Sequence, residues 1–194
     1  MWYIFRHGET LHNKNKIRQG RCASMLSLKG VDQVKSYAYR LLEQKEDLNK
    51  FKIITSPMVR TKETAQIICE ITGLDAYYKV QEEELLAESD LGIFTNIPFK
   101  VVQEKYDKSL YEIKDIWTYR YPEGESFNEI YDRILNFIKK YKNEENLLII
   151  THGCCFSFFK SILSGEKKEE IRAENLRPSQ NYFLKYDGKT VKLI

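Results

Sequence analysis

The chain alternates between short apolar runs and longer segments in which apolar residues recur every three or four positions. The runs occupy residues 2–5, 52–55, 77–80 and 147–151. The last of these is apolar except for its final threonine, which is typical of a strand covered on both faces in a parallel sheet. Residues 181–194 predict a hairpin instead, because Asp187 and Gly188 favour the backbone of a tight turn.

Four segments carry helical spacing. They are residues 31–42, 64–71, 127–141 and 155–163. Gly73 follows the second segment at the position of a C-cap. Ser126 and Glu129 open the third with the spacing of a capping box, in which each side chain satisfies a backbone N–H of the first turn. These signals predict four helices between and after the strands.

Strands that alternate with helices along one chain predict an α/β three-layer sandwich with a largely parallel central sheet. Because 194 residues can bury one substantial core, we expect a single domain over residues 1–194. Residues 89–124 interrupt the alternation with short helical patterns and many aromatic residues. We expect this segment to be an insertion over one edge of the sheet, acting either as a lid or as an ordinary packed cap.

Composition and charge narrow the choice of partners. Hydrophobic residues make up 42% and charged residues 30%, as in a globular protein. With 31 basic and 28 acidic residues the net charge is only +3, which excludes a strong field for nucleic acid but allows a local pocket for a small anion. No apolar run approaches the ~20 residues that span a bilayer, and residues 2–5 lack the basic leader of a signal peptide. We expect no nucleic-acid or membrane partner.

The four cysteines, at positions 22, 69, 154 and 155, show no paired C-x-x-C spacing. Two adjacent cysteines would form a strained disulfide at best. Free thiols in a reducing compartment are therefore expected, with the cytoplasm as the expected location.

Polar residues follow three of the predicted strands. The first strand is followed by Arg6 and His7, the second by Ser56 and Arg60, and the last by His152. Ligands of open α/β sheets bind beyond the carboxyl ends of the strands, so we expect these side chains at one rim. Two arginines and two histidines at a common rim make a site for a polyanion, above all for phosphate.

Two of these positions also begin helices. Arg60 lies in the first turn of its predicted helix, where backbone N–H groups favour an anion. His152 is followed by Gly153, whose missing Cβ lets a bound group come close to the backbone. His12, five residues past His7, has no comparable position and is interpreted as a rim residue. Singly, each signal also fits a structural histidine or a surface ion pair, so their shared position indicates the site.

The segments around these residues resemble a known family. "RHGET" (6–10) is followed by Asn13 and Gln19-Gly20, then by "SPMVRTKETA" (56–65), "PEGES" (122–126) and "THG" (151–153). In this order the motifs are similar to those of the histidine phosphatase superfamily, also called the phosphoglycerate mutase-like family, and they span nearly the whole chain. The resemblance implies the three-layer α/β fold of that family.

The resemblance also implies a role for each matching residue. His7 would be the nucleophile that accepts the phosphoryl group as a phosphohistidine. Arg6, Arg60 and His152 would hold the transferred group, with His152 cationic when phosphate is bound. The substrate-binding set that it implies is Arg6, Asn13, Gln19, Gly20, Arg60, His152 and Gly153. No metal or other cofactor is expected, because arginines can supply the positive charge that phosphoryl transfer needs.

The leaving alkoxide needs a proton, so a carboxylic acid is expected opposite His7. The family's general acid lies in a Leu-x-Glu segment ahead of a glycine, which here makes Glu88 the expected acid. Glu84, in the same acidic run, is the alternative. Glu125 matches a family position too, but the helix start at Ser126 already explains that motif. Glu9 could fix the tautomer of the nucleophile or cap a turn, and stays outside the expected catalytic set.

Two segments depart from the family pattern. "GIFTN" (92–96) stands where the family often has Gly-x-Trp-Glu-Gly, and "RCASMLS" (21–27) replaces a common Asp-x-Pro-Leu-Thr. The Glu-Arg-His-Tyr-Gly segment of the cofactor-dependent mutases is absent. We therefore expect a metal-independent phosphomonoesterase that hydrolyses a small phosphorylated metabolite. Phosphoglycerate mutase-type phosphoryl transfer and a non-catalytic phosphate-binding module are the alternatives.

The segment "HGCCFSFFK" (152–160) invites two other readings. A cysteine-dependent phosphatase needs His-Cys-x5-Arg, but Lys160 stands where the arginine would be, and lysine does not replace a bidentate guanidinium. A zinc site built from His152, Cys154 and Cys155 is disfavoured, because adjacent cysteines rarely present both sulfurs in tetrahedral geometry. The cysteines are expected to be small packing residues.

Overall fold

The computed structural model describes residues 1–75, 80–172, 176 and 182–194. Its central sheet has six strands in the order β4-β3-β6-β1-β7-β8. The strands are β1 (Trp2–Arg6), β3 (Lys52–Thr55), β4 (Val80–Glu82), β6 (Leu147–Thr151), β7 (Leu184–Tyr186) and β8 (Val191–Leu193). The first four lie parallel to their neighbours among themselves, and β7 and β8 add an antiparallel hairpin next to β1. The expected largely parallel sheet is confirmed.

The predicted strands agree closely with these bounds. Residues 52–55 and 147–151 are strands, and the first strand reaches one residue further, to Arg6. Of the run at 77–80, residues 77–79 lie outside the described residues, and the strand there is Val80–Glu82. In the predicted hairpin, residue 181 also lies outside them, whereas Gly188 has the positive φ of 93° that its turn requires.

Helices cover both faces of the sheet. They are α2 (Leu28–Leu42), α3 (Val59–Thr72), α6 (Phe127–Tyr141) and α7 (Gly153–Leu163). The helix expected at 31–42 begins earlier because Ser27 caps it, its hydroxyl accepting from the Gly30 N–H at 3.1 Å. Gly73 ends α3 in the left-handed conformation, and the Ser126–Glu129 capping box is formed with both of its hydrogen bonds.

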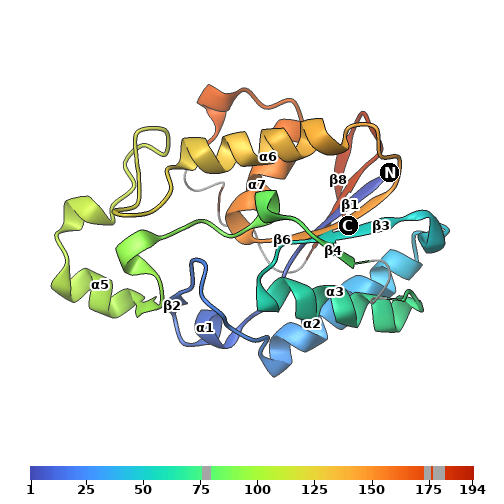
Figure 1. The fold of residues 1–194 in the computed structure, drawn as a ribbon, viewed down its shortest axis with the longest axis horizontal. Coiled ribbons are helices and arrows are strands. Elements are labelled where there is room, and N and C mark those ends of the chain that lie inside the picture. Colours follow the sequence, from blue (N-terminus) through green and yellow to red (C-terminus); the bar gives the residue numbers. More distant parts are fainter. Residues whose placement is uncertain (76–79, 173–175, 177–181) are drawn as a thin grey trace.

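Side-chain alternation along the buried strands divides the core in two. Trp2 and Ile4 of β1 belong to the hydrophobic cluster that includes residues of α6 and α7. Tyr3 and Phe5 belong to the cluster with α2 and α3. Figure 1 shows the sheet between these two helical layers. Since burial of each large apolar side chain stabilises the fold by roughly 1.5–3 kcal/mol, both faces of every central strand contribute.

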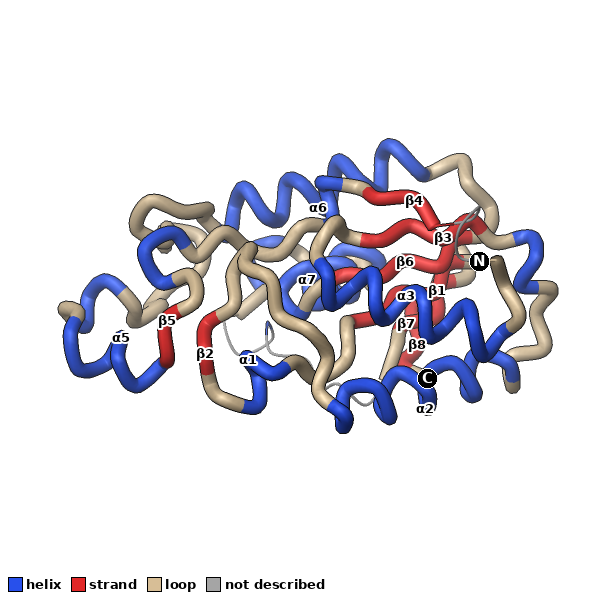
Figure 2. The backbone as a smooth tube through the Cα atoms, turned by 60° about the horizontal axis from the view of Figure 1, so that its bottom comes forward, coloured by secondary structure: helices blue, strands red, loops and turns tan. Residues whose placement is uncertain are grey.

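The cap segment (residues 89–124) lies beyond the strand ends, at the left of Figure 1. It contains β5 (Ile97–Pro98) and α5 (Phe99–Lys105). β5 pairs antiparallel with β2 (Ile17–Arg18), which follows the short α1 (Leu11–Lys14), and Figure 2 shows the two small strands side by side. Short 3₁₀ helices occur at η1 (Leu48–Lys50), η2 (Glu84–Leu86), η3 (Gly92–Phe94), η4 (Lys108–Leu110) and η5 (Lys168–Glu170). The buried Phe94, Val102 and Tyr121 of the cap segment share the core cluster of α6 and α7.

Two further expectations concern membrane-spanning segments and the state of the cysteines. Within the described ranges, no helix combines the length and the apolarity needed to cross a membrane. All four cysteines are free thiols, as expected. The cytoplasmic location stays a prediction.

Candidate active site

The pairing of three adjacent strands brings the predicted site residues to one rim. β6 lies between β1 and β3, with Arg6 opposite Thr151 and Thr55 opposite Ile150. Backbone hydrogen bonds continue this register one residue beyond the strands. The N–H of His7 donates to the Thr151 carbonyl at 3.0 Å, and the N–H of Ser56 to the Ile150 carbonyl at 3.0 Å. The sheet therefore fixes where the polar residues emerge.

A cavity of about 930 Å³ opens at this rim. Seven of the predicted residues line it, namely Arg6, His7, Asn13, Gln19, Gly20, Glu88 and Gly153. Arg60 and His152 do not line it, since both are fully buried behind its wall. The rings of His7 and His152 nevertheless lie close, with centroids 5.2 Å apart. His12 forms a hydrogen bond with Asn96 at 2.8 Å and takes no part in the cavity lining.

His7 is held as one tautomer. Its Nδ1 lies 2.7 Å from the carbonyl oxygen of Gly8, and a carbonyl only accepts, so Nδ1 carries the proton. Burial, followed by the charges of Arg60 and Arg6, holds the pKa of His7 well below its ordinary 6.5. The ring is therefore neutral near neutral pH, with the unprotonated lone pair on Nε2. This is the form that an imidazole nucleophile requires.

Close backbone packing positions the loop that carries His7. A Cβ on Gly8 would come within 2.5 Å of the Gly30 carbonyl, and one on Gly30 would come within 2.0 Å of the Glu9 carbonyl. The loop after β1 thus lies directly against the first turn of α2. Glu9 secures this contact, because its carboxylate accepts from the Ser27 hydroxyl at 2.8 Å. Glu9 has a supporting contact, consistent with its place outside the expected catalytic set.

The buried guanidinium of Arg60 joins three parts of the site. It donates to the carbonyls of Gly20 at 2.9 Å and Cys22 at 3.0 Å, and its Nε donates to Nδ1 of His152 at 3.3 Å. Gly20 adopts a positive φ of 52°, which turns its carbonyl into this contact without steric cost. Burial lowers the pKa of Arg60, yet a guanidinium stays charged at any ordinary pH. A fixed positive charge therefore lies behind the cavity wall.

His152 is neutral in this arrangement. Because its Nδ1 accepts from Arg60, Nε2 carries the proton and donates to the Ser56 hydroxyl at 2.7 Å. Burial, followed by the charge of Arg60 and the neighbouring His7, holds its pKa well below 6.5. The cationic form expected with phosphate bound stays a prediction.

Glu88 lines the cavity directly beside the same two groups. Its Oε2 lies 3.5 Å from Nδ1 of His152 and 3.7 Å from Nη2 of Arg60. The backbone N–H of Ser89 donates to its Oε1 at 3.0 Å. Glu84, the alternative, is exposed at the start of η2 and is not among the residues that line the cavity. The geometry favours Glu88.

The sequence analysis missed a network that supports the Glu88 segment. Arg133 of α6 donates to both carboxylate oxygens of Glu125 at 3.0 Å, and also to the carbonyls of Leu85 at 2.8 Å and Ala87 at 3.1 Å. Arg21 bridges from the other side, to Glu125 at 2.8 Å and to the Glu88 carbonyl at 3.1 Å. Glu125 could have been found from the sequence, because it matches a motif position of the family. No motif or spacing pointed to Arg133 or Arg21.

Cys155 is buried, whereas Cys154 is partly buried and lines the same cavity as His7. Burial raises the pKa of the Cys154 thiol well above 9.0 and that of Cys155 to about 11. A thiol kept protonated is a poor nucleophile. The structure gives no support to a cysteine-based mechanism.

Three groups could hold a metal ion on geometry alone. Ligand atoms of His7, Glu88 and His152 all lie within 4.8 Å of one another. The charged guanidinium of Arg60, however, bonds to His152 and lies beside Glu88, where it would repel a cation. This donor set fits an anion better than a metal.

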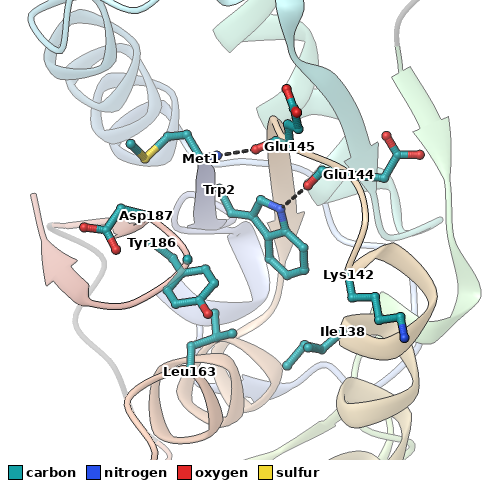
Figure 3. A pocket seen from close by; sticks show the side chains of 10 residues that line it. Met1, Trp2, Ile138, Lys142, Glu144, Glu145, Leu163, Tyr186 and Asp187 are labelled. Carbon is teal, nitrogen blue, oxygen red and sulfur yellow. Dashed lines mark hydrogen bonds between the residues drawn. The ribbon is translucent and has the colours of Figure 1, made fainter.

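A smaller cavity of about 380 Å³ lies at the opposite end of β1. Figure 3 shows Trp2, Ile138, Leu163 and Tyr186 around it, with the Trp2 indole donating to the Glu144 carbonyl at 2.9 Å. None of the predicted site residues lines it.

Comparison with known proteins identifies the family of the chain. Residues 2–194 match the family model of the histidine phosphatase superfamily, branch 1. The chain belongs to this superfamily. Membership confirms the expected fold and the expected enzyme class, a phosphatase of the histidine phosphatase type.

Three similar proteins illustrate the range of the superfamily. Over 173 residues the chain is 32% identical to human 6-phosphofructo-2-kinase/fructose-2,6-bisphosphatase 1, covering 84% of this chain and 33% of the human protein. The chain thus spans about a third of the length of that relative. It is 30% identical over 187 residues to the probable phosphoglycerate mutase GpmB of Shigella boydii, covering 90% and 80% of the two chains. The α-ribazole phosphatase of Shigella flexneri shares the fold, with a TM-score of 0.76, 22% identity and coverage of 100% and 94%.

Proposed function

We propose that this histidine phosphatase hydrolyses a small phosphorylated metabolite, without a metal, through a phosphohistidine on Nε2 of His7. The observation that carries the proposal is the 2.7 Å hydrogen bond from Nδ1 of His7 to the Gly8 carbonyl. It leaves Nε2 as the unprotonated nitrogen of a buried, neutral ring in a cavity shared with Arg6 and Glu88. A nucleophile, a cation and a carboxyl group in one cavity are the parts that phosphomonoester hydrolysis needs.

In the first step, Nε2 attacks the phosphorus atom in line with the leaving oxygen. The P–N bond forms as the P–O bond breaks, and Glu88 in its protonated form gives its proton to the leaving alkoxide. Arg6 and Arg60 stabilise the equatorial oxygens. In the second step, water attacks the phosphohistidine, Glu88 takes the proton from the water, and the P–N bond breaks to release phosphate and regenerate His7.

Arg60 and His152 serve this reaction once an anion enters. The Glu88 carboxylate lies beside both of them, at 3.7 Å and 3.5 Å. A phosphoryl group takes the place of that carboxylate beside the positive charge, so Glu88 is released to take up a proton and to approach the leaving oxygen as the acid. Asn13, Gln19 and Gly20 line the cavity beyond and contact the substrate.

We also propose that residues 1–194 form one catalytic domain with the cap segment over its site. Leu91, Phe99, Tyr111 and Tyr121 of the cap segment line the same cavity as His7. The part of the substrate beyond the phosphoryl group would therefore contact the cap segment.

The experiment that tests the mechanism is trapping of the intermediate with a 32P-labelled phosphomonoester in the presence of a chelator. We expect an acid-labile, base-stable phosphoenzyme in the wild type and none in His7→Ala. Normal hydrolysis by His7→Ala would overturn the proposal. The same assay with 3-phosphoglycerate distinguishes release of inorganic phosphate from formation of an isomer, which is the outcome that similarity to the Shigella boydii protein suggests as a second candidate.

A further inference from the structure

Arg18, at the end of β2, presents a cation to the active-site cavity without a protein counter-charge. It lines the same cavity as His7. Its guanidinium carbon lies 5.4 Å from the ring centroids of both Phe94 and Phe99, and 6.0 Å from that of Tyr121. Among the residues that the structure describes, no carboxylate pairs with it. Its Nη1 is shielded from solvent and has no hydrogen-bond partner.

A buried guanidinium nitrogen without a hydrogen-bond partner lowers the stability of the fold unless a bound ligand supplies an acceptor. Arg18 as a whole is only partly buried, and aromatic rings attract its guanidinium through their faces, but they leave the buried Nη1 without an acceptor. Buried donors without partners oppose folding, and the low local dielectric makes each missing bond more costly. The cavity lining includes two acidic residues, and both have other partners: Glu112 pairs with Lys108 at 2.8 Å, and Glu88 lies 3.7 Å from Arg60.

We propose that Arg18 binds a second anionic group, a carboxylate or a phosphate, on the substrate whose phosphoryl group reacts at His7. This inference rests on the proposed phosphatase function and names its substrate class, a phosphomonoester with a further anion. Aromatic walls make the contact strong, because a guanidinium that has lost its water binds an anion more tightly. Gln19, next in the chain, also has a buried Oε1 without a partner, and this acceptor suits a hydroxyl group of the substrate rather than the anion.

The backbone keeps Arg18 in place for this role. Arg18 pairs with Ile97 across the small β2–β5 sheet, and its carbonyl accepts from the Asn96 N–H at 2.7 Å. β2 and β5 of the cap segment lie side by side (Figure 2), so the backbone of Arg18 is fixed against the cap segment. The cap segment supplies Phe94, Phe99 and Tyr121 around it, so charge and cap act as one subsite.

The test compares ligands that differ only in the second anion. Affinities are measured by calorimetry in a His7→Ala background, which prevents turnover. 3-Phosphoglycerate and glycerol 3-phosphate differ by a carboxylate in place of a hydroxymethyl group. Fructose 1,6-bisphosphate and fructose 6-phosphate differ by a phosphate, so the two pairs distinguish the two anions. We expect the more anionic member of at least one pair to bind about ten-fold more tightly, as expected for a charge-assisted contact.

Arg18→Met should reduce that preference at least about five-fold, and Arg18→Gln, which keeps polarity, should reduce it as well. Arg40→Met is the matched control, because Arg40 also lies over two aromatic rings, at 5.5 Å from Tyr37 and 5.6 Å from Phe183, but outside the cavity lining. Repeating the titrations at about 0.5 M KCl separates a direct contact, which persists, from a long-range field, which is screened.

Equal affinities within both pairs, or a preference that both Arg18 variants leave unchanged, would overturn the inference. A preference lost at high salt would do so too. The proposed function fails on different measurements, namely normal hydrolysis by His7→Ala or the absence of a phosphoenzyme in the wild type. The binding result for Arg18 and the activity result for His7 are therefore read independently.

Discussion

Arg133 and Glu125 form a two-bonded ion pair in which Nε and Nη2 of the arginine each lie 3.0 Å from a carboxylate oxygen. The remaining nitrogen of Arg133 donates to the carbonyls of Leu85 and Ala87, immediately before Glu88. Both partners are mostly buried, with 16% and 17% of their side chains exposed. A pair of this geometry fixes the backbone that delivers Glu88, so Arg133 acts as a positioning residue for the proposed acid.

From this relationship we predict the effect of Arg133→Met. The variant should lower kcat about ten-fold or more for alkyl phosphates, whose poor leaving group needs a well-placed acid, and much less for p-nitrophenyl phosphate. Steady-state kinetics on the two substrates measure the difference. Arg120→Met is the control, because Arg120 also pairs with a glutamate near the start of α6 but is 56% exposed. An equal loss on both substrates would show that Arg133 stabilises the fold without positioning Glu88.

The choice between the two candidate acids gives a second prediction. Glu88→Gln removes the proton donor while keeping the shape, and should lower kcat for alkyl phosphates by about 10²-fold or more. Glu84→Gln should leave the rate within about two-fold, since an exposed side chain outside the cavity lining has no access to the leaving group. Kinetics with a series of leaving groups check both variants. A leaving-group dependence that steepens in Glu84→Gln and not in Glu88→Gln would reverse the assignment.

The sequence predicts the sheet and its rim because those depend on local pattern. Apolar runs mark β3 and β6, and the polar residues that follow them converge because parallel strands end at one edge. His7 and Glu88 also belong to motifs, so their shared cavity could be anticipated. How deeply each side chain is buried at this rim could not be anticipated. That Arg60 lies behind the cavity wall depends on carbonyls of Gly20 and Cys22, which come from a loop without any periodic signal.

Arg18 and Arg133 are two residues whose roles the sequence did not predict. Each lies in a stretch whose pattern predicts nothing about its partners. Arg133 lies on α6 outside its buried apolar face, where an arginine is ordinary. Arg18 belongs to a strand of only two residues, which is too short to show any alternation. Their roles arise from contacts with residues far away in the sequence: Leu85 is 48 positions from Arg133, and Tyr121 is 103 positions from Arg18. Contacts at that range are set by packing, which one sequence does not display.

The packing of Gly30 against the loop after β1 gives a third prediction. Alanine in a helix interior is ordinarily favoured over glycine by about 1 kcal/mol. In Gly30→Ala, however, the new Cβ would come within 2.0 Å of the Glu9 carbonyl. We expect the free energy of unfolding in urea to fall by about 1–3 kcal/mol, the usual effect of overpacking. The control is Ser36→Ala on the exposed face of the same helix, which should not destabilise. Equal stability of both variants would mean that the loop moves aside without cost.

The two buried histidines give a fourth prediction, which concerns stability against pH. The pKa values of His7 and His152 are both held well below 6.5 in the folded state, first by burial. Below pH 6.5 the unfolded chain therefore binds protons that the folded protein does not. Above about pH 6.5 the two histidines do not reduce the free energy of unfolding. As the pH falls from there toward their folded-state pKa values, each histidine lowers the free energy of unfolding by up to about 1.4 kcal/mol per pH unit.

Urea unfolding at about pH 7.5 and about pH 5.5 measures this effect, because most carboxylates titrate below that window. We expect the wild type to lose stability between the two values. His7→Asn and His152→Asn should each reduce the loss, since each removes one group that protonates only on unfolding. His12→Asn is the matched control, because it makes the same substitution at a partly buried histidine outside the cavity lining. If the loss were the same in all three variants, the histidines would not be the groups that resist protonation, and a neutral His7 at the start of the reaction would lose its physical basis.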